Sequence, residues 1–139
     1  MYHICYKLSK ENEVIDIAFK ICVIEDDQAI ADMYQFKLQL EGYVVTTASN
    51  GAEGLKLLKT ERPDLILLDL RMPKMGGDEM LEKLRATQWG CGIRVIILTN
   101  ISKNEAPQKL RFLNVDRYVV KAHHTPAQVA EIVKSVLTG

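Results

Sequence analysis

The segment Leu65-Ile66-Leu67-Leu68-Asp69 places four apolar residues directly before an acidic one. It does not alternate between apolar and polar residues, as a strand with one exposed face does. A continuous apolar run of this length is typical of a strand buried on both faces, at the centre of a parallel sheet flanked by helices. We therefore expect residues 65–68 to form the central strand of such a sheet, with Asp69 at its carboxyl end.

Short apolar runs on either side repeat this pattern, and stretches with helical periodicity separate them. From Lys20 onward the alternation occurs five times, and strands are expected at residues 20–25, 44–48, 65–68, 95–98 and 118–120. Strands that alternate with helices in this way form a parallel α/β sheet. The sequence therefore predicts an α/β fold with a five-stranded parallel sheet and five flanking helices.

Capping signals predict where several of these helices begin. Asn50 is a candidate N-cap, while Ser102 with Glu105 and Thr125 with Gln128 have the spacing of capping boxes. We expect a fourth helix after Ser102 and a closing helix after Thr125.

The bulk composition fits one domain without a strong charge bias. The chain has 139 residues, of which 18 are Lys or Arg and 18 are Asp or Glu, so its formal net charge is zero. A neutral chain has no general attraction to nucleic acid or to anionic lipid. We assign residues 20–139 to one domain and residues 1–19 to an N-terminal extension without an assigned role.

The cysteines and the apolar segments favour a cytoplasmic protein. Cys5, Cys22 and Cys91 are odd in number and lack CxxC spacing, which argues against a disulfide framework or a zinc site. We expect reduced and mostly buried thiols. No apolar run is long enough to cross a membrane, and the N-terminus does not resemble a secretory signal.

Polar residues follow four of the expected strands where each strand ends. Asp26 and Asp27 follow the first strand, Asp69 the third, Thr99 the fourth and Lys121 the fifth. In an open parallel sheet these ends converge on one crevice, which is where ligands bind. Clustered carboxylates repel one another unless a cation lies among them, and Mg²⁺ prefers such oxygen ligands. A lysine and a hydroxyl beside them suit a phosphoryl group, so the set predicts phosphoryl transfer.

Residues 25–27 and 67–73, with Thr99, Tyr118 and Lys121, resemble the receiver domain of two-component response regulators. The resemblance covers residues 20–137. It implies a flavodoxin-like, doubly wound sheet with strand order 2-1-3-4-5. It also implies a signalling phosphoacceptor that catalyses only its own phosphorylation and dephosphorylation.

The resemblance also implies a role for each site residue. Asp69 would be the phosphoacceptor, assisted by Lys121 and Thr99. Asp27 and Asp69 would bind Mg²⁺ directly, Asp26 would bind it through water, and Arg71 would contribute its backbone carbonyl. Thr99 and Tyr118 would form the switch pair.

The partners implied are proteins. A histidine kinase or a histidine phosphotransfer protein would dock on the first helix and on the loop after Lys121. A downstream target would bind the face made by the fourth helix, fifth strand and fifth helix. We expect a stand-alone, chemotaxis-regulator-like receiver without direct nucleic-acid or membrane contact.

Two residues depart from the family pattern at the crevice. The family usually has proline after the strand-end lysine, where this chain has Ala122, and often a small residue after the hydroxyl residue, where this chain has Asn100. The family peptide bond before that proline is typically cis, which is costly before a non-proline residue. Asn100, like Arg71 and Ile101, is expected to influence the lifetime of an acyl phosphate.

Three alternative functions remain. A haloacid-dehalogenase-type phosphohydrolase would need a second aspartate two residues after Asp69, where Arg71 stands. A flavodoxin-like cofactor carrier would need a phosphate-binding loop after the first strand, where the sequence is acidic. A constitutive protein-interaction module is the third, and the acceptor, the acidic pair and Lys121 argue against it.

Overall fold

Five parallel strands form the central sheet in the order β4-β3-β5-β6-β7. The structure is a computed structural model that describes residues 6–8, 14–16 and 18–139. The strands are β3 (Lys20–Ile24), β4 (Val44–Ala48), β5 (Leu65–Leu68), β6 (Arg94–Thr99) and β7 (Arg117–Val120). Counted within this sheet, the order is 2-1-3-4-5, so the predicted α/β topology is confirmed. All four residues of β5 are buried at the centre, as their apolar run predicted.

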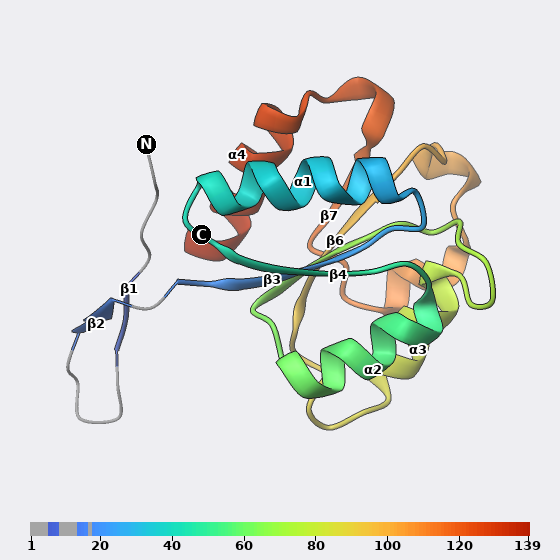
Figure 1. Cartoon of the computed structure of the whole chain (residues 1–139). Coiled ribbons are helices and arrows are strands. Elements are labelled where there is room, and N and C mark those ends of the chain that lie inside the picture. The colour runs from blue at the N-terminus through green and yellow to red at the C-terminus, as the bar shows by residue number, and fades with distance from the viewer. Residues whose placement is uncertain (1–5, 9–13, 17) are drawn as a thin grey trace.

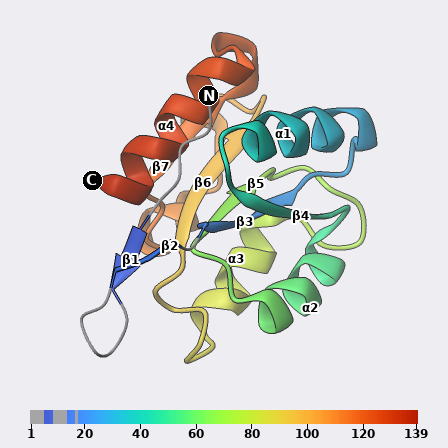
Figure 2. The same ribbon diagram turned by 60° about the vertical axis from the view of Figure 1, so that its left-hand side comes forward.

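The α-helices cover both faces of the sheet (Figures 1 and 2). On one face lie α1 (Gln28–Leu40) and α4 (Pro126–Thr138), and on the other lie α2 (Gly51–Glu61) and α3 (Gly77–Arg85). Alternate residues of the strands point to opposite faces and create two apolar clusters. The first joins β3, β5 and β6 to α1 and α4, and includes Val23, Leu67, Ile96, Leu38 and Val133. The second joins the same strands to α2 and α3, and includes Ile24, Leu68, Ile97, Leu58 and Met80.

The prediction of five flanking helices is wrong, because the described residues contain four α-helices. The expected fourth helix is replaced by two short 3-10 helices, η1 (Lys103–Glu105) and η2 (Gln108–Phe112). Ser102 makes no side-chain capping bond, and Ala106 has an extended backbone with ψ of 150°. Pro107 explains the break, since proline disfavours a helical conformation in the residue before it.

The other two capping predictions are confirmed. The Asn50 side chain accepts a hydrogen bond from the Glu53 backbone N–H at 2.9 Å. Thr125 and Gln128 form a complete capping box, with Pro126 in the first turn of α4. These caps fix the start of α2 and α4 from local sequence alone.

The N-terminal segment is described in part, and the expectation about the thiols has a mixed outcome. Strands β1 (Tyr6–Leu8) and β2 (Val14–Asp16) pair with each other in a separate antiparallel sheet, within the segment expected to be an extension. Cys22 is buried but Cys91 is exposed, so the expectation of mostly buried thiols fails for Cys91, and Cys5 lies outside the described residues.

Among the described helices, none has the length and hydropathy needed to cross a membrane.

Candidate functional site

A crevice of about 390 Å³ opens at the carboxyl ends of the strands. Its lining includes every strand-end residue that the sequence predicted, namely Asp26, Asp27, Asp69, Thr99 and Lys121. The prediction that these residues converge is therefore correct. Arg71 and Asn100 also line the crevice, whereas Tyr118 lines a neighbouring one.

Asp69 is a buried residue of this crevice, at 7% exposed. Its Oδ1 accepts hydrogen bonds from the backbone N–H of Leu70 at 2.7 Å and of Arg71 at 3.4 Å. Its Oδ2 lies 3.2 Å from the Lys121 ammonium. The start of α3 approaches closely, because a Cβ added to Gly77 would lie 2.1 Å from the Asp69 carbonyl oxygen. Only glycine fits at that position, so the backbone that carries the Asp69 side chain is tightly packed.

Lys121 joins two acidic side chains across the crevice. Its ammonium donates to Glu25 Oε1 and to Asp69 Oδ2. Burial by itself would lower the pKa of Lys121, but the bond to Glu25 and the charges of Asp69 and Glu25 outweigh it and raise that pKa. The lysine is therefore held as a cation beside the predicted acceptor.

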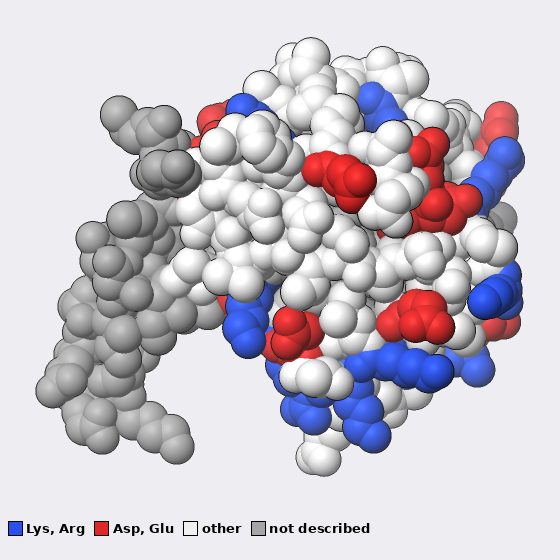
Figure 3. All heavy atoms as spheres, viewed as in Figure 1, with Lys and Arg blue, Asp and Glu red and all other residues white. Residues whose placement is uncertain are grey.

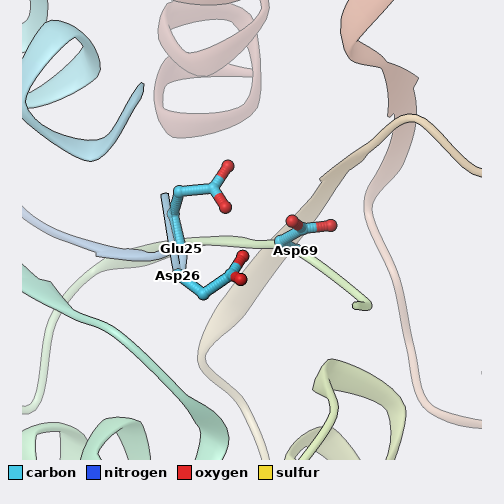
Figure 4. A group of neighbouring side chains, drawn as sticks. All are labelled: Glu25, Asp26 and Asp69. Carbon is cyan, nitrogen blue, oxygen red and sulfur yellow. The ribbon is translucent and has the colours of Figure 1, made fainter. Parts of the chain in front are cut away.

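Three carboxylates form a compact group at the ends of β3 and β5. One oxygen from each of Glu25, Asp26 and Asp69 lies within 4.8 Å of the others. Figure 4 shows the three side chains around a common space, with Asp69 on the strand next to the one that carries Glu25 and Asp26. An all-oxygen set of this kind fits a hard divalent cation such as Mg²⁺.

The sequence prediction of the metal ligands differs from this group at one position. Asp27 Oδ1 accepts a hydrogen bond from the Ile30 backbone N–H at 3.2 Å and is the N-cap of α1. The compact group contains Glu25 in its place, which sequence reasoning missed. All three adjacent acids, Glu25, Asp26 and Asp27, line the crevice. Which two of them join the compact group with Asp69 depends on how the chain turns from β3 into α1.

Glu25 is a weak acid in this setting. It is 5% exposed. Burial raises its pKa to about 7, with the Lys121 bond opposing this and the Asp69 charge adding to it. Between about pH 4.5 and pH 7, Glu25 is therefore protonated to a greater extent in the folded chain than in the unfolded chain.

Replacement of Glu25 should change how the free energy of unfolding depends on pH. An acid whose pKa is higher in the folded chain stabilises the fold at low pH. This contribution is lost as the pH rises from the unfolded pKa through the folded pKa. In the presence of a chelator, we expect the free energy of unfolding of Glu25→Gln, relative to that of wild type, to be about 2 to 3 kcal/mol higher at pH 8 than at pH 5. Urea unfolding at the two pH values measures this difference, and an equal difference at both would contradict it.

Thr99 and Tyr118 contact the same residue of the loop after β6. Thr99 is 1% exposed, and its hydroxyl accepts from the Ile101 backbone N–H at 3.4 Å. The Tyr118 hydroxyl donates to the Ile101 carbonyl at 2.7 Å. Burial raises the Tyr118 pKa, and the nearby charges of Asp69 and Glu105 add to the shift. Ile101 thus links the two residues predicted to be the switch pair, although their role as a switch remains a prediction.

The loop after β7 is well formed despite the absence of proline. Residues Lys121–His123 make a 3-10 helix, η3, and the peptide bond between Lys121 and Ala122 is trans. The departure from the family pattern therefore leaves Lys121 at the crevice.

Comparison with known proteins agrees with this geometry. Residues 21–134 match the family model described as the response regulator receiver domain. A *Bacillus subtilis* relative, the alkaline phosphatase synthesis transcriptional regulatory protein PhoP, is 38% identical over 120 residues. That match covers 85% of this chain but 48% of the relative, so the chain spans about half the length of that protein.

Solved structures show the same architecture. The chemotaxis protein CheY4 of *Vibrio cholerae* has a TM-score of 0.80 at 27% identity, covering 86% of this chain and 99% of that one. A CheY-like response regulator receiver domain from *Methanospirillum hungatei* has a TM-score of 0.79 at 31% identity, covering 88% and 95%.

Proposed function

The chain belongs to the receiver-domain family of two-component response regulators, and from that premise we propose that Asp69 is its phosphoacceptor. The observation that carries this proposal is the contact of Asp69 Oδ2 with Lys121 at 3.2 Å, beside the group formed by Glu25, Asp26 and Asp69. The Asp69 carboxylate therefore lies beside a cation and beside two further carboxylates that could hold a metal ion with it. That arrangement supplies the positioning and charge stabilisation that phosphoryl transfer requires.

In the proposed reaction, a carboxylate oxygen of Asp69 attacks the phosphorus of a phosphohistidine. The new O–P bond forms while the N–P bond breaks, and the electron pair of that bond stays on the imidazole nitrogen. Lys121 would bind one phosphoryl oxygen, and the Thr99 hydroxyl would donate to another. Hydrolysis of the resulting acyl phosphate would restore the free carboxylate.

Mg²⁺ is the proposed cofactor. Asp26 and Asp69 would hold it directly, Glu25 would contribute to the same site, and the Arg71 carbonyl would complete the protein ligands. When bound, the ion would neutralise charge on the phosphoryl oxygens. Direct binding by Asp27 would require its side chain to leave the α1 cap, so we favour Glu25 over Asp27 as the third carboxylate.

The proposed partners are proteins. A histidine kinase or phosphotransfer protein would dock on α1 and η3, and a downstream target would bind the face that carries η1, η2, β7 and α4. Direct binding to nucleic acid or membranes is not proposed, since the formal net charge is zero and basic and acidic side chains lie side by side along the lower part of the face in Figure 3. We propose a cytoplasmic location.

Intact-mass measurement with a small phosphodonor tests this function. With acetyl phosphate and Mg²⁺, we expect the mass of the protein to rise by one phosphoryl group, and we expect no rise when a chelator replaces Mg²⁺. Failure of the wild-type chain to gain mass or to bind beryllofluoride would contradict the proposal.

A matched pair of variants identifies the carboxylates that bind the metal. Asp26→Asn should raise the Mg²⁺ concentration needed for phosphorylation, because it removes a charged ligand. Asp27→Asn should change it much less, because asparagine caps a helix as well as aspartate does. A larger effect of Asp27→Asn than of Asp26→Asn would instead support Asp27 as the direct metal ligand, as the resemblance implies.

A further inference from the structure

The two residues that depart from the family pattern contact each other. The Asn100 side-chain Oδ1 accepts a hydrogen bond from the Ala122 backbone N–H at 3.1 Å. Asn100 follows β6 and Ala122 belongs to η3, so the bond joins two loops at the mouth of the crevice. Proline has no N–H, so this bond depends on a residue other than proline at position 122.

The bond lies just beyond the end of the sheet. The register between β6 and β7 ends at the pair Thr99 and Val120. Asn100 follows β6 and Lys121 follows β7, and neither residue takes part in the β6–β7 pairing. The side-chain bond from Asn100 to Ala122 therefore extends the connection between the strands past their last pair.

We propose that Asn100 is a positioning residue that holds the Lys121 segment against the end of β6. Thr99 and Lys121 come from the two segments that this bond connects, and both would bind oxygens of the same phosphoryl group. If the separation between Thr99 and Lys121 is fixed in advance, the two residues need not rearrange when the phosphoryl group binds. The inference rests on the proposed function, because it assigns Asn100 to the same site.

The bond itself can be tested without any phosphoryl group. Asn100→Ala should increase the amide hydrogen exchange rate of Ala122, because its N–H then loses its partner. Asn104→Ala is the matched control, since Asn104 is an exposed residue of the same type in the neighbouring η1. An unchanged Ala122 exchange rate in Asn100→Ala would show that the contact does not form in solution and would overturn the inference.

The functional consequence is measured by calorimetric titration with beryllofluoride in saturating Mg²⁺. Since an exposed hydrogen bond contributes modestly, Asn100→Ala should weaken beryllofluoride binding by about threefold to tenfold. Binding of Mg²⁺ alone should stay within about twofold of wild type, because its proposed ligands follow β3 and β5 and not β6 or β7. A loss of Mg²⁺ affinity equal to the loss for beryllofluoride would indicate a general structural effect and would also overturn the inference.

A double-mutant cycle identifies the path of the effect. Ala122→Pro removes the donor, so Asn100→Ala should cause no further loss in that background. An equal loss in both backgrounds would mean that Asn100 acts without Ala122, which contradicts the proposed mechanism. If Ala122→Pro does not fold, the exchange and two-ligand measurements decide the question. Absence of beryllofluoride binding by wild type would instead count against the proposed function itself, and the exchange result would still judge the contact.

Discussion

Asp69→Asn should abolish phosphoryl uptake from acetyl phosphate. The substitution keeps the size of the side chain but removes the charged oxygen that is proposed to attack phosphorus, and an amide is a poor nucleophile. It also removes one of the three carboxylates of the proposed metal site. Intact mass after incubation with acetyl phosphate and Mg²⁺ should show no phosphoryl gain, even at times when the wild-type chain is largely modified.

The control is Asp32→Asn, which changes the same kind of residue on the outer face of α1. Asp32 is exposed and accepts a hydrogen bond from the Gln28 side chain. This variant should gain the phosphoryl mass as wild type does. Modification of Asp69→Asn at the wild-type rate would place the acceptor on another residue and would remove the central element of the proposed function.

Lys121→Met should both destabilise the protein and nearly eliminate phosphoryl uptake. Without the ammonium, the buried carboxylates of Glu25 and Asp69 lose the cation that neutralises them. Removing one partner of a buried ion pair costs about 3 kcal/mol or more, because the remaining charge is left unpaired. Urea unfolding at pH 8 in the presence of a chelator measures this loss of stability.

The pH and metal dependence separate this mechanism from a simple packing defect. Glu25, with a pKa of about 7, can take up a proton at lower pH, so the cost of Lys121→Met should shrink as pH falls from 8 to 5. Added Mg²⁺ should also recover part of the stability. Lys83→Met, at an exposed position of α3, is the control and should have little effect at any pH. A cost of Lys121→Met that is independent of pH would argue that the lysine stabilises the fold through its aliphatic chain.

Alternatives to phosphoacceptor function become weaker with the family established. The haloacid-dehalogenase-type hydrolase lacks its second acid because Arg71 follows Asp69 by two residues. A constitutive interaction module would not need the contact between Lys121 and Asp69. The same mass measurement that tests Asp69→Asn distinguishes these possibilities, since a constitutive module would gain no phosphoryl group.

The sequence by itself determined the sheet, the starts of α2 and α4, and the residues that meet at the crevice. The apolar run at 65–68 places its strand at the centre, and the alternation with helices makes the strands parallel. In a parallel sheet all carboxyl ends lie at one edge, so Asp69, Thr99 and Lys121 had to converge. Local capping chemistry was also sufficient where no residue opposed it, as at Asn50 and Thr125.

Only the tertiary structure decided which side chains face one another within that crevice. The strand-end position of Glu25, Asp26 and Asp27 was clear from sequence, but the turn into α1 directs Asp27 to the helix cap and leaves Glu25 beside Lys121. The contact between Asn100 and Ala122 likewise joins loops that are separated by 22 residues. Periodicity reports the strand or helix to which a residue belongs, whereas the direction of a side chain in a loop depends on backbone angles fixed by distant packing.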